Sequence, residues 1–192
     1  MMEITEKSKD MTEHIENQFC DEIIHWLARH LDSDYAGIEA IFNENNARLF
    51  LFIWPVFEKE VFEKNMTLNK INGRARMFEN HHQHLDLEGM TKRFHARYKN
   101  CNEVYQRLIN REPKNSNESI NRIFNKKYDD VLLYEKMKLL FFVTYRYRNN
   151  IFHGNKDILN WDNNEEQIRD CITFMIKIIE INKALKEEKA SH

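Results

Sequence analysis

Two side chains that could carry polar chemistry, Arg148 and His153, lie five residues apart in the stretch YRNNIFHG. Histidine titrates near neutral pH and can take or give a proton, whereas arginine stays charged and can hold two phosphate oxygens with its planar fork. The pair is therefore a candidate for chemistry on a phosphate ester. The alternative is a pair of cations that meet the negative end of a helix macrodipole.

The spacing by itself is weak evidence, because Arg76 and His81 have the same separation. The context favours the pair at 148–153. It follows the most apolar segment of the chain, where charged groups are rarely placed without partners. Asn149 directly follows the arginine, and Gly154 directly follows the histidine and is typical of a helix C-terminus.

Helix geometry separates the two side chains. Five positions on a regular α-helix turn through about 500°, which leaves Arg148 and His153 about 140° apart unless the helix unwinds near Gly154. One chain therefore offers one Arg and one His, whereas two copies around a two-fold axis would offer two of each. Asn149 is expected to hydrogen-bond the imidazole or a phosphate.

Arg146 and Tyr147 directly precede the pair. They would add a cation and a stacking surface beside the site, as supporting residues for a substrate. Each has an alternative interpretation. Tyr147 could pack in the core or in an interface, and Arg146 could be a solvated flank.

Standard cofactor and metal signals are missing from the sequence. It holds no Gly-rich phosphate loop, no GxSxG, no HExxH and no paired CxxC. His81, His82, His84 and His95 could suggest zinc, but adjacent histidines without a regularly spaced acidic or Cys partner are usually surface residues. We therefore expect no metal and no cofactor.

The composition favours a helical globular protein. Hydrophobic residues are 42% and charged residues 31% of the chain, and only four Gly and two Pro interrupt it. The N-terminus shows no signal peptide, and the longest apolar run, 49–57, is about half of a membrane span. Three isolated cysteines, Cys20, Cys101 and Cys171, suit a reducing compartment, and each is expected to be a small buried residue. The sequence thus predicts a cytoplasmic all-α protein.

Hydrophobic periodicity predicts five or six helices. Residues 11–31 form one amphipathic helix, and residues 36–65 form a longer one that Pro55 kinks or breaks. Residues 69–89 are a short helix, a loop or a segment ordered by a partner. The remaining predicted elements are a helix over 90–110, a loop over 110–119, a central buried helix capped by Asp129 or Asp130, and a final helix capped by Asp162 with Glu165.

Charge is unevenly distributed along the chain. Residues 1–69 hold 6 Lys and Arg against 14 Asp and Glu, residues 70–127 hold 13 against 6, and residues 128–192 hold 10 against 11. The middle third is therefore a basic block. It either attracts phosphates or neutralises the acidic N-terminal third, within the chain or across a dimer.

The stretch RNNIFHG after a long hydrophobic helix resembles the R-x(4–6)-H motif of the HEPN superfamily, in which Asn, Asp or His often follows the Arg directly. The resemblance covers roughly residues 129–180. It implies a helical bundle over 36–192. Residues 1–35 would then be an N-terminal helical extension, and 69–127 an insertion-like basic segment.

Many HEPN proteins are metal-independent endoribonucleases that serve as toxins or as anti-phage and abortive-infection effectors. The resemblance therefore implies an RNA-cleaving homodimer, in which Arg148 and His153 of two protomers meet across the interface and Asn149 supports them. Such cleavage needs a base near the 2′-OH, an acid near the leaving 5′-oxygen and positive charge beside the phosphorane. Two alternatives stay open: a module that binds RNA, a nucleotide or a protein without cutting, and a non-catalytic subunit of a toxin–antitoxin or defence complex.

Overall fold

A computed structural model describes residues 18–30, 35–36, 46–82, 85–109, 114–152 and 164–191 of the chain. Every regular element in these residues is a helix and none is a strand, which confirms the predicted all-α class. The chain divides into two compact units, Met1–Arg48 and Leu49–His192. The boundary between the units falls within α3 (Asn46–Phe62). The sequence predicted an N-terminal extension that ends earlier, at residue 35.

The first unit holds a helix over residues 18–30. This confirms the central part of the helix predicted over 11–31, whose first residues lie outside the described range. The apolar side chains follow helical spacing and are buried: Ile23, Ile24, Trp26, Leu27 and Ala28.

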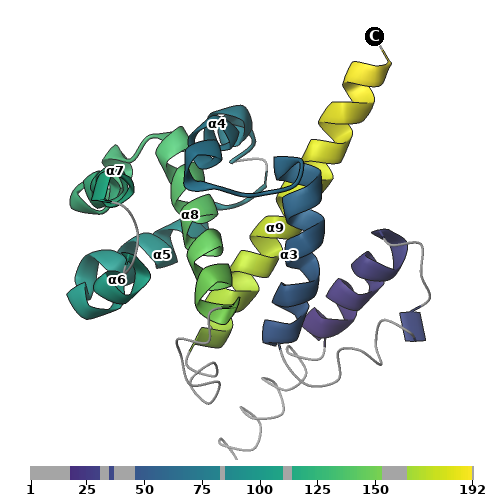
Figure 1. Cartoon of the computed structure of the whole chain (residues 1–192), viewed down its shortest axis with the longest axis horizontal. Coiled ribbons are helices and arrows are strands. Elements are labelled where there is room, and N and C mark those ends of the chain that lie inside the picture. The colour runs from purple at the N-terminus through teal and green to yellow at the C-terminus, as the bar shows by residue number, and fades with distance from the viewer. Residues whose placement is uncertain are drawn as a thin grey trace, which may run out of the picture. The chain divides into compact units, whose positions relative to one another are not determined.

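The second unit is built around α8 (Leu133–Phe152), which α4, α5, α6, α7 and α9 all contact. Figure 1 shows α8 among these helices, with α9 beside it. The bounds of the other elements are α4 Leu68–Phe78, η1 Glu79–His81, α5 Glu88–Asn100, α6 Asn102–Ile109, α7 Lys114–Asn125, η2 Tyr128–Asp130 and α9 Glu165–Ala190, where η marks a short 3₁₀ helix. The described residues thus hold more helices than the five or six predicted.

Phe141 of α8 is the centre of the core in this unit. Its ring centre lies 6.1 Å and 5.6 Å from those of Phe57 and Phe62 in α3. It lies 6.2 Å from Phe78 in α4 and 4.9 Å from Phe174 in α9. All five rings are at most 1% exposed, and each such aromatic pair adds about 0.5–1.5 kcal/mol beyond the burial of area. One side chain of α8 therefore links three other helices.

Glu135 determines where α8 begins. Its carboxylate accepts a 3.0 Å hydrogen bond from the backbone N–H of Leu132, three positions earlier, which is the reciprocal half of a capping box. The same carboxylate binds Nζ of Lys126 at 2.6 Å. Asp129 and Asp130, predicted as N-caps, belong instead to η2. That prediction was wrong because the cap comes from a downstream Glu and not from a preceding Asp.

The helix predicted over 90–110 is in fact two helices, α5 and α6. Cys101 between them has an extended backbone, with φ −131° and ψ 94°. Asn100 and Asn102 flank this break, and Asn favours helix ends and turns over helix interiors. Cys101 is exposed at the break, so the expectation that each cysteine is buried is wrong there, whereas Cys171 is buried.

The loop predicted over 110–119 is wrong for residues 114–119, which belong to α7. The first four residues of that stretch lie outside the described range. The first turns of α7 are polar in sequence. The buried residues of the helix come later: Ile120, Ile123 and Phe124. Polar composition was therefore a poor guide to a helix whose packing comes later in its sequence.

α3 continues through Pro55, so the expected break does not occur there. Pro55 is exposed, while Ile53 and Phe57 on the same helix are fully buried. α3 ends at Phe62 and not at 65, because Glu63 adopts a left-handed backbone with φ 64°. The apolar run 49–57 lies within α3, and none of the described helices has the length and apolar character that a bilayer span requires.

The basic segment 69–127 packs directly on the central helix, since α4 to α7 all contact α8. For 69–89, the short-helix alternative is confirmed by α4 and η1. Part of the positive charge is neutralised within the chain. Arg74 pairs with Glu63 of the acidic third at 3.0 Å, whereas Lys126 pairs with Glu135 of the C-terminal third.

Replacing Phe141 by Ala should lower the free energy of unfolding by about 3–5 kcal/mol, because the change removes ring contacts to three helices and leaves a cavity. Phe52→Ala is the matched control, since Phe52 of α3 is 42% exposed, and it should cost about 1 kcal/mol or less. Urea denaturation followed by circular dichroism measures both. Equal losses in the two variants would contradict the central role of Phe141.

Candidate functional site

Arg148 is partly buried on α8, and two neighbours orient its guanidinium. The guanidinium carbon lies 5.7 Å from the ring centre of Trp54 in α3, within the range of a cation–π contact. Nη1 donates a 3.1 Å hydrogen bond to Oδ1 of Asn149. Asn149 therefore contacts the arginine of the motif, while its predicted bond to the imidazole or to a phosphate stays a prediction.

Trp54 is itself held in place by a carboxylate. Its exposed fraction is 2%, and its indole N–H donates a 3.2 Å hydrogen bond to Oε2 of Glu58. The other oxygen of Glu58 accepts a 2.9 Å hydrogen bond from the backbone N–H of Met66. The turn after α3 thus fixes Glu58, Glu58 fixes the indole, and the indole orients Arg148.

Arg146 is buried on another side of α8, with 5% of it exposed. Its Nε–H donates a hydrogen bond to the backbone carbonyl of Leu108, near the C-terminus of α6, where a positive charge meets the negative end of the helix dipole. The alternative of a solvated flank is therefore wrong. Arg146 holds α6 against α8, while its direct contact with a substrate stays a prediction.

Tyr147 joins the end of α8 to α5 and α9. Its hydroxyl donates a 3.3 Å hydrogen bond to Oδ1 of Asn164 and also contacts the hydroxyl of Tyr98. The same oxygen of Asn164 accepts a 3.1 Å hydrogen bond from Nη2 of Arg97. Burial raises the pKa of the Tyr147 hydroxyl well above its ordinary value, so it stays protonated at neutral pH. With 9% exposed, the ring packs as a core residue, and its use as a stacking surface stays a prediction.

Asn164 is the N-cap of α9. The predicted cap, Asp162, is therefore wrong, because the helix begins two residues later than that cap requires. The Asn164 side chain makes no capping bond to its own helix and instead receives the bonds from α8 and α5. The start of α9 is thus tied to the end of α8 through one amide oxygen.

His153 and Gly154 lie outside the described residues, which reach Phe152 and resume at Asn164. The structure therefore describes the arginine half of the motif. The placement of His153 relative to Arg148, and the meeting of two copies across a dimer, stay predictions.

The competing pair, Arg76 and His81, has different surroundings. Arg76 is exposed on α4, and its guanidinium carbon lies 4.6 Å from the ring centre of Tyr134. His81 belongs to η1 and is partly buried. Because this pair keeps the spacing but lies elsewhere in the fold, it provides a control for the motif at 148–153.

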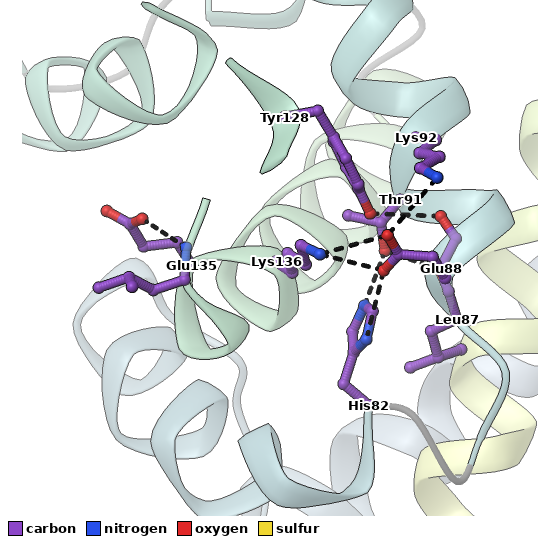
Figure 2. Close-up of polar contacts among 9 residues, drawn as sticks. His82, Leu87, Glu88, Thr91, Lys92, Tyr128, Glu135 and Lys136 are labelled. Carbon is purple, nitrogen blue, oxygen red and sulfur yellow. Dashed lines mark hydrogen bonds and ion pairs between the residues drawn. The ribbon is translucent and has the colours of Figure 1, made fainter. Parts of the chain in front are cut away.

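A second polar cluster lies where the end of η1, α5 and α8 meet (Figure 2). Nζ of Lys136 binds the two carboxylate oxygens of Glu88 at 3.1 Å and 3.3 Å. The hydroxyl of Tyr128 donates a 3.3 Å hydrogen bond to the backbone carbonyl of Glu88. Nδ1 of His82 lies 3.9 Å from the same carboxylate. The cluster thus ties four segments together at Glu88: the end of η1, α5, η2 and α8.

The protonation of His82 follows from its neighbours. Thr91 donates its hydroxyl hydrogen to the carbonyl of Leu87 at 2.7 Å, so its oxygen accepts from Nε2 of His82 at 3.0 Å. Nε2 therefore carries the proton, and the lone pair is on Nδ1. Burial lowers the pKa of His82, with a smaller opposing effect from the carboxylate of Glu88. The side chain is fully buried and out of reach of a substrate, so this cluster is structural.

The expectation that these histidines are surface residues is wrong for His82 and His95, which are 0% and 3% exposed. Nε2 of His95 lies 3.2 Å from the backbone carbonyl of Ile123, and burial lowers the pKa of this imidazole as well. Both imidazoles serve as buried hydrogen-bonding groups. Among the described residues, no three His, Cys, Asp or Glu side chains come together as metal ligands.

Trp54, Arg97 and Asn164 are neighbours of the motif that sequence reasoning did not assign. Trp54 and Arg97 are far from position 148 in the chain, so no local pattern links them to it. A signal for Trp54 exists in its helix, because a buried indole N–H needs an acceptor and Glu58 follows at i+4. A signal for Asn164 is also present, since Asn is among the preferred N-cap residues.

Comparisons of the chain with models of known protein families, with curated proteins and with solved structures give no match. The functional assignment of this site therefore rests on its geometry and on the sequence motif.

The free energy of unfolding should fall as the pH drops below about 6.5, because the unfolded chain then binds protons that the buried His82 and His95 do not take up. The folded-state pKa of each histidine is lowered, so this stability is complete above the unfolded pKa and is lost toward the folded one. Each contributes a slope of at most about 1.4 kcal/mol per pH unit. His82→Gln should therefore flatten the dependence between pH 5.5 and 7.5, measured by denaturant titration. An unchanged slope would contradict the neutral, buried state of His82.

Proposed function

We propose that the protein is a HEPN-like, metal-independent endoribonuclease that acts as a homodimer. Arg148 and His153 are its catalytic residues, and Asn149 supports them. Its substrate is RNA, and its role is that of a toxin or an anti-phage defence effector, restrained by an antitoxin or by a partner in a defence complex.

The observation that carries this proposal is the orientation of Arg148. Its guanidinium lies over the indole of Trp54 and donates to Asn149, in the last described turns of the helix that organises the core. A planar guanidinium that is already oriented loses less freedom when it binds two phosphate oxygens. Arg146 and Tyr147 support this end of the helix from its other sides through α6, α5 and α9.

In this proposal, His153 of one protomer removes the proton from the 2′-OH, and the 2′-oxygen attacks the adjacent phosphorus. The bond to the 5′-oxygen breaks, and His153 of the other protomer protonates that leaving oxygen. Arg148 binds the non-bridging oxygens while negative charge builds on the phosphorane. The products are a 2′,3′-cyclic phosphate and a 5′-hydroxyl. Two copies are required because one motif supplies a single histidine.

The purified protein should cleave RNA in the presence of EDTA and leave 2′,3′-cyclic phosphate ends. Arg148→Ala and His153→Ala should each lower the cleavage rate by about 100-fold or more, since each removes a group that acts in the transition state. Circular dichroism and the dimer mass should stay unchanged. Arg76→Ala and His81→Ala are the matched controls, because they alter a pair with the same spacing, and both should keep full activity.

The two-fold site gives a second readout of the same variants. A mixture of wild-type and His153→Ala chains forms heterodimers that keep a single histidine, so the activity per wild-type chain should fall as the share of His153→Ala chains rises. Full activity in either folded single variant would contradict the proposal. Tight RNA binding without cleavage by the wild-type chain would instead favour the non-catalytic RNA-binding alternative.

A further inference from the structure

An open groove of about 620 Å³ lies between the α5–α6 break and the start of α9. Its volume is in the range of small-molecule and nucleotide sites. One wall comes from the basic block and the other from α9. The side chains that matter for its chemistry are Arg93, Arg97, Asn100, Val104, Glu166 and Asp170.

Arg93 is already neutralised by the opposite wall. Its Nε and Nη2 donate to the two carboxylate oxygens of Asp170 at 3.0 Å and 2.5 Å, and Glu166 lies 3.4 Å from its Nε. The bidentate bond to Asp170 raises the pKa of Arg93. This pair closes one end of the groove and leaves no positive charge there for a ligand.

Arg97, one turn further along α5, is in a different state. No carboxylate in the described part of the chain forms an ion pair with it. Its Nη2 donates to the neutral amide oxygen of Asn164, and its Nε is buried without a hydrogen-bond acceptor among the described residues. A partly buried guanidinium with an unused donor is costly, and it normally has an anionic partner. The partner that fits is an anion entering from the groove.

The acidic wall limits the kind of anion. A guanidinium fork matches phosphate oxygens, but Glu166 and Asp170 on the facing helix repel each additional negative charge. A phosphodiester with one charge is therefore favoured over a phosphomonoester with about two. Val104 and the amide of Asn100 offer an apolar surface and a hydrogen-bonding group to the attached nucleoside.

The groove also lies at the correct end of the central helix. Asn164 accepts hydrogen bonds from both Arg97 and Tyr147, the residue directly before Arg148. Successive residues of a helix point about 100° apart, so Arg97 and Arg148 serve different faces of the same end of α8.

We propose that the groove between α5 and α9 binds a phosphodiester of single-stranded RNA, with Arg97 as its phosphate ligand. The identity of the strand as RNA rests on the proposed function. The anion site rests on Arg97, which forms no ion pair with a carboxylate of the described residues and whose Nε has no hydrogen-bond acceptor among them. Arg97 is thus a substrate-binding residue and takes no part in proton transfer.

Binding is measured by fluorescence anisotropy on the full chain, with a labelled 2′-O-methyl RNA that has no 2′-OH to attack. Arg97→Gln should weaken binding about tenfold and reduce the dependence of log K on log salt by about 0.7, the loss of one phosphate contact. Arg107→Gln is the matched control, because it removes the same charge from an exposed arginine of α6 that pairs with Glu103. It should change the affinity less than twofold. Equal effects of the two variants, or no binding by the wild type, would overturn the proposal.

Two further measurements separate the other outcomes. Without ligand, Arg97→Gln should melt at or above the wild-type temperature, because it removes a partly buried charge that forms no ion pair with any carboxylate of the described residues. A lower melting temperature would refute that premise. Uridine 5′-monophosphate should compete more weakly than the RNA, and stronger competition would assign the groove to a free nucleotide.

Failure of this proposal differs from failure of the proposed function. RNA binding that depends on Arg97, with no cleavage, would support the groove proposal and contradict the proposed nuclease function. Cleavage by Arg97→Gln with an unchanged KM would support the nuclease function and contradict the groove proposal.

Discussion

The aromatic packing of Phe141 is the interaction on which the rest of the second unit depends. Phe141 and Arg148 are seven positions apart on α8 and therefore share one face of that helix. Phe141 contacts Phe57 and Arg148 contacts Trp54. The later residue of α8 thus meets the earlier residue of α3. The two helices are thus antiparallel neighbours, and the contact that forms the core also brings the indole over the guanidinium. The orientation of Arg148 is a consequence of core packing and needs no separate loop.

The other sides of α8 are fastened by polar bonds. Arg146 is about 200° from Arg148 around the helix and reaches the carbonyl of Leu108 in α6. Tyr147 lies between these directions and meets α5 and α9 through Tyr98 and Asn164. Three consecutive side chains therefore hold one helix end from three directions. The position of Arg148 is therefore supported on all of these sides by described residues.

Sequence reasoning succeeded where the signal is local and repeated. The apolar periodicity of α8 and α9 predicted both helices, and the scarcity of Gly and Pro predicted the all-α class. It failed where a long-range contact decides the outcome. Nothing near position 114 indicates that Ile120, Ile123 and Phe124 bury one face of α7 and thereby keep its polar first turns helical. The break at Cys101 was likewise invisible to an apolar pattern that continues across it.

The same distinction applies to the site. The motif itself marked Arg148 and Asn149, but Trp54 and Arg97 come from helices distant in the sequence and are brought to α8 by packing. The net charge of +7 in the basic block gives the amount of positive charge. It does not say which of these side chains are already paired with carboxylates. Arg93, Arg74 and Lys126 are satisfied by carboxylates, and the difference between them and Arg97 appears only once the helices are assembled.

The order of the aromatic residues along the chain has a consequence for biosynthesis. Phe57, Phe62 and Phe78 precede Phe141, and Phe174 follows it. The aromatic core around Phe141 is therefore complete only after the ribosome has synthesised most of the sequence. Until then, α3 and α4 lack the aromatic rings of α8 and α9 that bury Phe57, Phe62 and Phe78. A nascent chain therefore carries Trp54 and Arg97 before their partners, Arg148 and Asn164, have been synthesised. This end of α8 can therefore assemble only late in the synthesis of the chain.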